Sequence, residues 1–157
     1  MNLALLTIGK TKSEFIKDGL NHYLNRLRRY VNYEVKVLPD IKNSGKMSRE
    51  EQKEIEGQQI IANLSPSDHV VLLDERGTQY DSVAFAEKLQ NRMASGKKRL
   101  VFIVGGPYGF SKPVYDRANG MLSLSKMTFN HEMVRLFFTE QIYRAMTILK
   151  GEPYHHQ

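Results

Sequence analysis

Apolar residues along this chain occur either in short unbroken runs or at helical spacing. Three runs, Asn2 to Ile8, Asp68 to Leu73 and Arg99 to Val104, are short and end at glycine or polar residues, which is typical of buried strands. Tyr33 to Leu38 alternates polar and apolar residues, and Met121 to Ser125 is a shorter apolar stretch. The pattern therefore predicts five strands.

Helices are predicted between these strands. The segment that begins at Ser13 is amphipathic and basic, and a Ser-x-x-Glu capping box marks the start of the next helix at Ser48. The predicted helices run from Ser13 to Tyr30, from Ser48 to about Leu64, from Ser82 to Gly96, from Ser111 to Asn119 and from Met133 to Leu149. Strands alternating with helices predict one α/β domain over residues 1–157, a sandwich with a mostly parallel sheet.

Composition narrows the choice of partners and of chemistry. Lys and Arg outnumber Asp and Glu by 23 to 17, and the net charge of +6 favours a polyanionic partner such as nucleic acid or an anionic membrane surface. The absence of cysteine excludes disulfides, thiolate metal sites and a cysteine nucleophile. No apolar run approaches the ~18 residues of a membrane span, and the start reads as a strand, so a cytoplasmic protein is expected.

Three segments follow predicted strands and are candidates for ligand binding, because ligands bind beyond the carboxyl ends of parallel strands. They are Asp74 to Gly77, Gly105 to Phe110 and Lys126 to His131. The glycines of the second segment let the backbone approach a ligand, and free N–H groups there can bind a base, a ribose or a phosphate. A tight turn between strand and helix explains the same glycines equally well.

Several more specific binding motifs are each incomplete in this sequence. A phosphate-binding loop needs a glycine where Phe110 stands, and the dinucleotide fingerprint is missing after the first strand, where the chain has Gly9 to Thr11. His131 and Glu132 begin a zinc-protease motif, but Arg135 occupies the place of its second histidine. No metal site is predicted.

Polar residues concentrate on the last helix and on the C-terminal tail. Spacing alone also fits a solvated helix face followed by a frayed, idle terminus. The set comprises His131, Arg135, Glu140, Gln141, Tyr143, Arg144, Lys150, Tyr154, His155 and His156.

Four ordered segments together resemble the RlmH family, the bacterial enzymes of the SPOUT (α/β-knot) superfamily that methylate N3 of a pseudouridine in 23S ribosomal RNA. The resemblance extends over the whole chain, beginning with the Leu-x-x-Ile-Gly-Lys pattern that ends at Lys10. Its segments are Leu72-Leu73-Asp74-Glu75-Arg76-Gly77, Ile103-Val104-Gly105-Gly106-Pro107-Tyr108-Gly109, Leu122 to Phe129, and Arg144-Ala145 with Gly151-Glu152-Pro153-Tyr154-His155.

The resemblance implies a SPOUT-type sandwich with a C-terminal trefoil knot, a homodimer with a shared active site, and S-adenosylmethionine as the methyl donor. It implies 23S rRNA within the assembled ribosome as the substrate, without a metal or a membrane. For electrostatic or phosphate-binding roles it points to Arg135, Arg144 and His155, and Tyr154 would orient the base. The implied cofactor residues are Leu73, Gly105, Gly106, Leu124, Ser125, Lys126, Met127, Thr128 and Phe129.

Two residues depart from the family pattern, and two other functions stay open. His156 stands where the family usually has Arg or Lys, and Asn130 stands where proline often precedes His131. The first departure removes a fixed charge near neutral pH, and the second predicts a less rigid loop before the last helix. The alternatives are a SPOUT enzyme that modifies transfer RNA and a non-catalytic protein that binds ribosomal RNA.

Overall fold

The computed structural model describes residues 1–156, whose strands form one five-stranded sheet in the order β2-β1-β4-β3-β5. The strands are β1 (Asn2–Ile8), β2 (Asn32–Leu38), β3 (His69–Thr78), β4 (Arg99–Val104) and β5 (Gly120–Leu122). All four strand pairings within this part of the chain are parallel. This confirms the predicted α/β class and the mostly parallel sheet.

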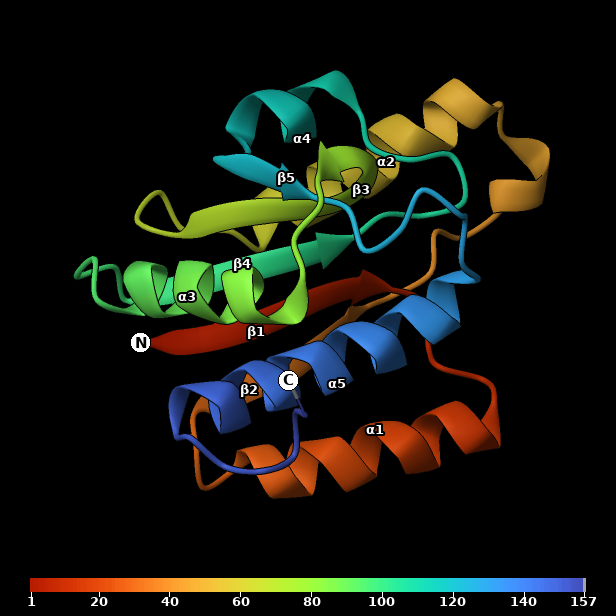
Figure 1. Cartoon of the computed structure of the whole chain (residues 1–157). Coiled ribbons are helices and arrows are strands. Elements are labelled where there is room, and N and C mark those ends of the chain that lie inside the picture. The colour runs from red at the N-terminus through yellow and green to blue at the C-terminus, as the bar shows by residue number, and fades with distance from the viewer. Residues whose placement is uncertain (157) are drawn as a thin grey trace.

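Helices cover both faces of the sheet (Figure 1). They are α1 (Glu14–Leu27), α2 (Arg49–Ala62), α3 (Ser82–Met93), α4 (Lys112–Arg117) and α5 (His131–Leu149), with a short 3-10 turn at Ser44–Lys46. Helices α1, α3 and α5 share one apolar core with the sheet, centred on residues such as Phe102 and Phe138. Helices α2 and α4 share a second core on the opposite face, which contains Ile60 and Ile103.

The central strands explain why the strongest apolar runs predicted strands so well. β1 and β4 lie next to each other in the middle of the sheet, and the two apolar cores cover both of their faces. Residues 3 to 7 and 100 to 104 are accordingly all buried. A strand that is buried on both faces reads as a continuous apolar run and does not alternate.

The end of β3 differs from the prediction that Asp74 to Gly77 break the strand. Pairing with β5 shifts register between Leu73 and Thr78, and β3 then continues to Thr78. At Gly77 the two backbones are so close that a Cβ atom would lie 2.6 Å from the Leu122 nitrogen. Residues 74–77 therefore bulge out of the ladder, as a β-bulge does, and lie beside the site described below.

Capping side chains fix where three of the helices begin. Ser48 caps α2 as predicted, since its hydroxyl accepts a hydrogen bond from the Glu51 N–H at 3.1 Å. For α3 the prediction of Ser82 was wrong by one residue, because Asp81 accepts the hydrogen bond from the Ala84 N–H at 2.8 Å. The Asn130 side chain accepts from the Glu132 N–H at 2.8 Å and so caps α5.

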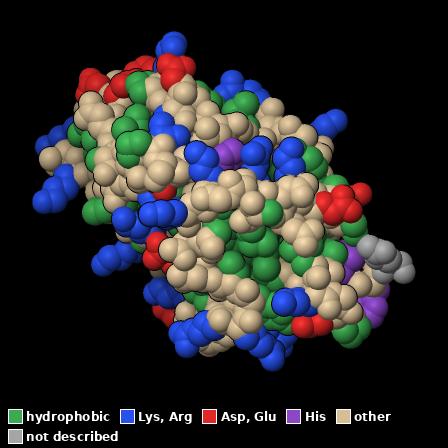
Figure 2. All heavy atoms as spheres, turned by 90° about the vertical axis from the view of Figure 1, so that its left-hand side faces the viewer, with side chains coloured by type: hydrophobic (Ala, Val, Ile, Leu, Met, Phe, Trp, Pro, Cys, Tyr) green, Lys and Arg blue, Asp and Glu red, His purple; other side chains and the backbone are tan. Residues whose placement is uncertain are grey.

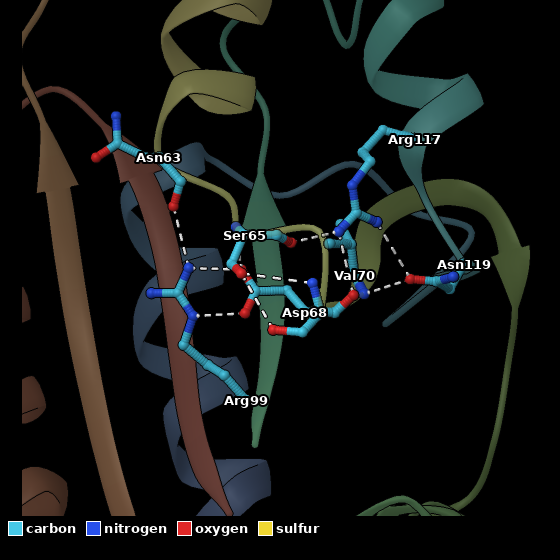
Figure 3. Close-up of polar contacts among 8 residues, drawn as sticks. Asn63, Ser65, Asp68, Val70, Arg99, Arg117 and Asn119 are labelled. Atoms are coloured by element: carbon cyan, nitrogen blue, oxygen red, sulfur yellow. Dashed lines mark hydrogen bonds and ion pairs between the residues drawn. The ribbon is translucent and has the colours of Figure 1, made fainter. Parts of the chain in front are cut away.

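A polar network ties together the amino ends of the strands (Figure 3). Arg99 donates to both oxygens of Asp68, at 3.0 and 2.6 Å, and to the carbonyl of Asn63 at 3.0 Å. Arg117 donates to the carbonyls of Ser65 and Asp68. Burial alone would raise the pKa of Asp68, but hydrogen bonds from Arg99 and the Ser65 N–H hold it below its usual range. This end of the sheet is therefore braced by buried charge pairing.

Candidate cofactor cleft and active site

A cleft of about 770 Å³ lies at the carboxyl ends of β3 and β4. All three segments that were predicted to bind ligands contribute to its lining, although they are separated along the chain. The lining residues include Leu73, Asp74, Glu75, Arg76, the loop 104–110, Leu122, Leu124, Ser125 and residues 127–131. Parallel strands bring such loops together because their carboxyl ends meet at one edge of the sheet.

The glycine loop after β4 forms one wall of this cleft. Gly109 has a φ of +80°, and its N–H donates to the carbonyl of Gly106 at 3.2 Å, which closes a tight turn. A Cβ atom at Gly105 would lie 3.2 Å from the ring of Phe110. A Cβ atom at Gly106 would overlap the carboxyl group of Glu56. The loop keeps its shape because glycine occupies these positions.

The opposite wall is apolar and comes from the segment between β5 and α5. Met127 is 77% exposed, and the ring of Phe129 packs against Phe137 with centroids 5.2 Å apart. The turn is held by its own hydrogen bonds, from the Met127 N–H to Ser125 Oγ at 2.9 Å and from Ser123 Oγ to the Ser125 carbonyl at 3.0 Å. Of the implied cofactor residues, Leu73, Gly105, Gly106, Leu124, Ser125, Met127, Thr128 and Phe129 line the cleft, whereas Lys126 is exposed beside it.

A charged cluster at the rim of the cleft joins two residues of the predicted segment Asp74 to Gly77 to Tyr115, which was not predicted. The hydroxyl of Tyr115, on α4, donates to Asp74 at 2.6 Å, and Arg76 hydrogen bonds to both residues. Burial would raise the pKa of Asp74, but the hydrogen bonds from Tyr115 and Arg76 hold it below its usual range. Asp74 therefore remains an anion. No spacing along the sequence marks Tyr115, which reaches the cleft through the packing of α4.

The C-terminal tail folds back onto α5. The guanidinium of Arg144 pairs with Glu140 at 2.6 Å and lies over the ring of Tyr154, 4.8 Å from its centroid. The Tyr154 hydroxyl donates to the same Glu140 oxygen at 2.9 Å. Arg144 also contacts His155 Nδ1 at 3.1 Å. The structure thus brings Arg144, Tyr154 and His155 together and contradicts the interpretation of a frayed tail.

These contacts assign hydrogen-bonding roles to two tail residues. A guanidinium only donates hydrogen bonds, so Nδ1 of His155 must accept one, which leaves the proton of the neutral ring on Nε2. Burial and hydrogen bonds with Tyr23 and Glu140 raise the pKa of Tyr154 well above its usual value. Tyr154 therefore stays protonated and serves as a donor.

A second depression of about 660 Å³ joins the tail to the cleft. It shares Leu122, Leu124 and Phe129 with the cleft and extends to His155. Its other lining residues include Tyr80, Ser82, Phe137, Glu140 and Gln141. The tail and the glycine loop thus border one continuous depressed surface.

Arg135 lies elsewhere, and its placement does not favour the electrostatic role that the resemblance gave it. Its side chain is 1% exposed. The guanidinium donates to the carbonyls of Gly9 and Ile8, at 2.8 and 2.9 Å, and to the Thr11 hydroxyl at 3.0 Å. It fastens α5 to the end of β1 and is not available to RNA.

Within residues 1–156, no group of three or more His, Asp or Glu side chains is arranged to hold a metal ion. None of the helices there is both long enough and apolar enough to cross a membrane.

Comparison with known proteins agrees with this architecture. A family described as predicted SPOUT methyltransferase matches residues 1–155, which defines the class. The ribosomal RNA large subunit methyltransferase H of Porphyromonas gingivalis is 52% identical over 157 residues, and that of Flavobacterium johnsoniae is 51% identical, with both chains covered completely in each case. Among solved structures, the SpoU methyltransferase AviRb from Streptomyces viridochromogenes matches 96% of this chain and 61% of its own, with a TM-score of 0.47 and 14% identity.

The chain therefore belongs to the SPOUT methyltransferases and, among them, to the family of these ribosomal RNA large subunit methyltransferase H proteins. This confirms the resemblance on which the sequence analysis relied.

Proposed function

We propose that this protein transfers a methyl group from S-adenosylmethionine to N3 of a pseudouridine in the 23S rRNA of the assembled ribosome, and that it acts in the cytoplasm. One observation carries the proposal: Leu73, the glycine loop and residues 122–131 meet in a single cleft at the carboxyl ends of β3 and β4. The names and the full-length similarity of the relatives support the choice of large-subunit rRNA.

The cleft suits S-adenosylmethionine in three respects. Gly105 and Gly106 contribute only backbone to the lining of the cleft, since Phe110 and Glu56 leave no room for a side chain there, and backbone N–H and carbonyl groups suit an adenine. Leu73 and Leu124 offer apolar surface for that ring. The exposed side chain of Met127 adds further apolar surface to the lining. When bound, this cofactor supplies an electrophilic methyl group carried on a sulfonium.

The tail and the second depression are suited to hold the acceptor base. N3 of pseudouridine is flanked by two carbonyl groups and must lose its proton to attack the methyl group, and the negative charge left by the proton is shared by their oxygens until the methyl group is gained. Within residues 1–156 His155 Nε2 has no hydrogen-bond partner, so it can donate to such an oxygen while Nδ1 is held by Arg144. Arg144 itself is neutralised by Glu140, which makes it a positioning residue for Tyr154 and His155.

A homodimer and a trefoil knot belong to the same proposal. Phe137 is 41% exposed on α5 beside Phe129, an apolar pair that a second copy of the chain would cover. The close passage of Gly77 against β5 is consistent with a threaded C-terminal segment. We expect light scattering to give twice the mass of one chain, and Phe137→Glu to give the mass of one. A single-chain mass for the unaltered protein would contradict the dimer.

The function is tested with ribosomes from a strain that lacks the modification. Incubation with radiolabelled S-adenosylmethionine should label one pseudouridine of 23S rRNA, identified by nuclease digestion and mass spectrometry. Gly105→Val, which would clash with Phe110, is the inactive control. Label found in transfer RNA would mean another substrate class, and an absence of binding to S-adenosylhomocysteine in calorimetry would mean a non-catalytic RNA-binding protein.

A further inference from the structure

A third, smaller pocket of about 210 Å³ lies between α3 and the β3–β5 edge of the sheet. Its interior is apolar, with side chains that include Val71, Phe85, Leu89, Phe102 and Met121. Its lining follows β3 from His69 to Thr78, and it adjoins the other two depressions, since it shares Leu122 with the cofactor cleft and Tyr80, Phe85 and Leu122 with the second depression.

Cations surround the mouth of this pocket. Lys88 and Arg92 lie one turn apart on α3 and belong to its lining. Burial lowers the pKa of His69, and so do the nearby charges of Arg92, Lys97 and Arg117. The ring therefore stays neutral while the potential around it is positive. Figure 2, which views the side of the molecule that lies to the left in Figure 1, shows Lys and Arg side chains gathered beside a histidine.

These cations are not neutralised by the protein. The ion pairs formed among residues 1–156 involve neither Lys88, Arg92 nor Lys97. The nearby carboxylate of Asp68 is buried and is already paired with Arg99. An external anion is therefore free to bind them.

An aromatic ring completes the rim. Tyr80 is 37% exposed, and Lys88 Nζ lies 5.8 Å from the centroid of its ring. Exposed aromatic rings beside lysine and arginine are the usual means of binding single-stranded nucleic acid, in which bases stack and phosphates pair with the cations. Met121, which is also partly exposed, adds apolar surface at the same mouth.

We infer that this pocket is a second RNA site, in which one unpaired base of the substrate RNA packs against Tyr80 and Met121 while the adjacent phosphates pair with Lys88 and Arg92. The pocket is smaller than the ~300 to 1,000 Å³ of a typical ligand site, which suits a single base and excludes a whole cofactor. The inference rests on the proposed function, since it takes RNA to be the substrate. It adds a binding site that adjoins the depression proposed for the methylated base and selects for unpaired RNA.

The test measures binding of a fluorescent oligouridylate of about ten nucleotides as a function of salt concentration. Lys88→Gln with Arg92→Gln should weaken binding by about tenfold and reduce the slope of log affinity against log salt by roughly 0.7 for each phosphate that is no longer neutralised. Lys36→Gln with Lys42→Gln is the matched control, since Lys36 belongs to β2 at the opposite edge of the sheet and Lys42 follows that strand. The control should leave affinity and slope nearly unchanged.

Tyr80, which also lines the second depression, provides a further arm that is read together with the Lys88 and Arg92 variant. Tyr80→Ala should weaken oligouridylate binding by about tenfold, whereas Tyr80→Phe keeps the stacking ring and should bind normally. Binding of S-adenosylhomocysteine, measured by calorimetry, should stay at the unaltered level in every variant, which shows that the cleft is intact. Ultraviolet cross-linking of 4-thiouridine RNA should label peptides from residues 78–92 or 119–122.

The outcomes separate this inference from the proposed function. If the unaltered protein methylates ribosomes but the Lys88 and Arg92 variant binds oligouridylate with the normal salt slope, the second site is refuted and the proposed function stands. If the variant loses binding to ribosomes yet keeps normal RNA binding, the pocket binds a protein instead. If the unaltered protein does not methylate ribosomes but the variant still loses RNA binding, the proposed function fails and the site remains.

Discussion

The carboxyl group of Glu56 lies directly behind the backbone of Gly106, so closely that a methyl group at residue 106 would overlap it. Glu56 belongs to α2 and is only 4% exposed, and its Oε1 accepts a hydrogen bond from Gln52 at 2.9 Å. The glycine loop of the cofactor cleft is thus shaped from behind by a buried acid that does not line the cleft itself.

This relationship predicts that Gly106→Ala weakens binding of S-adenosylhomocysteine by about tenfold or more, because the added methyl group pushes the loop away from Glu56 and into the cleft. In the double variant with Glu56→Ala the obstacle is gone, so affinity should recover in large part. Gly45→Ala is the matched control, since a Cβ atom there meets nothing within 4 Å. Calorimetry on the four proteins decides the matter: a double variant no better than Gly106→Ala would show that Glu56 is not the obstacle.

The same residue predicts a pH dependence of stability. Burial raises the pKa of Glu56 above its ordinary value of 4.5, and the charge of Asp40 adds to this, against the hydrogen bond from Gln52. The folded state therefore loses stability relative to the unfolded state as pH rises from about 4.5 through the raised pKa, by ~1.4 kcal/mol for each unit of pKa difference.

Glu56→Gln cannot ionise and should escape that loss. Its free energy of unfolding, measured with urea between about pH 4 and 8, should therefore increase relative to the unaltered protein as pH rises. Glu51→Gln, at an exposed position in the first turn of the same helix, serves as the comparison. A difference between Glu56→Gln and the unaltered protein that stays constant over this pH range would be evidence against a buried carboxyl group with a raised pKa.

Sequence patterns predicted the layers of this fold because burial leaves a periodic signature. β1 and β4 have the predicted bounds, since strands buried on both faces are apolar throughout. The end of β3 was predicted wrongly, because its continuation depends on Leu122, a residue far along the chain whose backbone passes against Gly77. Local patterns carry no information about such a crossing.

The site was predictable where it depends on strand ends and not where it depends on packing. Strand ends and glycines indicated the segments Asp74 to Gly77 and Gly105 to Phe110 before any comparison, whereas Leu73 came only from the family resemblance. Glu56 gave no signal, because a charged residue in an amphipathic helix normally faces solvent. Arg135 was misleading in the opposite sense, because it was expected to act on RNA. Nothing in its spacing along the sequence reveals that backbone carbonyls enclose its guanidinium.

Arg135 supplies a further prediction that separates structural from RNA-binding arginines. Arg135→Ala removes three hydrogen bonds from a charged donor and should lower the free energy of unfolding by about 3 kcal/mol or more. Arg135→Lys restores the charge but not the planar fork, so it should recover only a small part. Urea denaturation measures both. Lys150→Ala, at an exposed residue after the same helix, should change stability little.

If Arg135 bound RNA directly, its loss would lower affinity for RNA without a comparable loss of stability. RNA binding is therefore measured at low temperature, where circular dichroism shows the variant to be folded. Normal affinity under those conditions supports the structural role, and a tenfold loss would contradict it.

The tail leads to the last prediction. Because Tyr154 and His155 are fixed to α5 through Glu140 and Arg144, removal of residues 154–157 should leave cofactor binding intact and reduce methyl transfer by about a hundredfold or more. His155→Ala should reproduce most of that loss if Nε2–H donates to the base. His156→Ala, at an exposed neighbour, should be nearly normal and controls for general effects on the tail.

Tyr154→Phe distinguishes anchoring from catalysis within the tail. The phenylalanine ring keeps the packing against Tyr143 and Arg144 but loses the hydrogen bond to Glu140. The tail should therefore remain docked on α5 but be held less firmly. We expect an activity between those of the unaltered and truncated proteins, with an unchanged affinity for S-adenosylhomocysteine. Single-turnover assays on ribosomes measure the methyl transfer step directly. Full activity of the truncated protein would show that the docked tail takes no part in the reaction, however well ordered its contacts are.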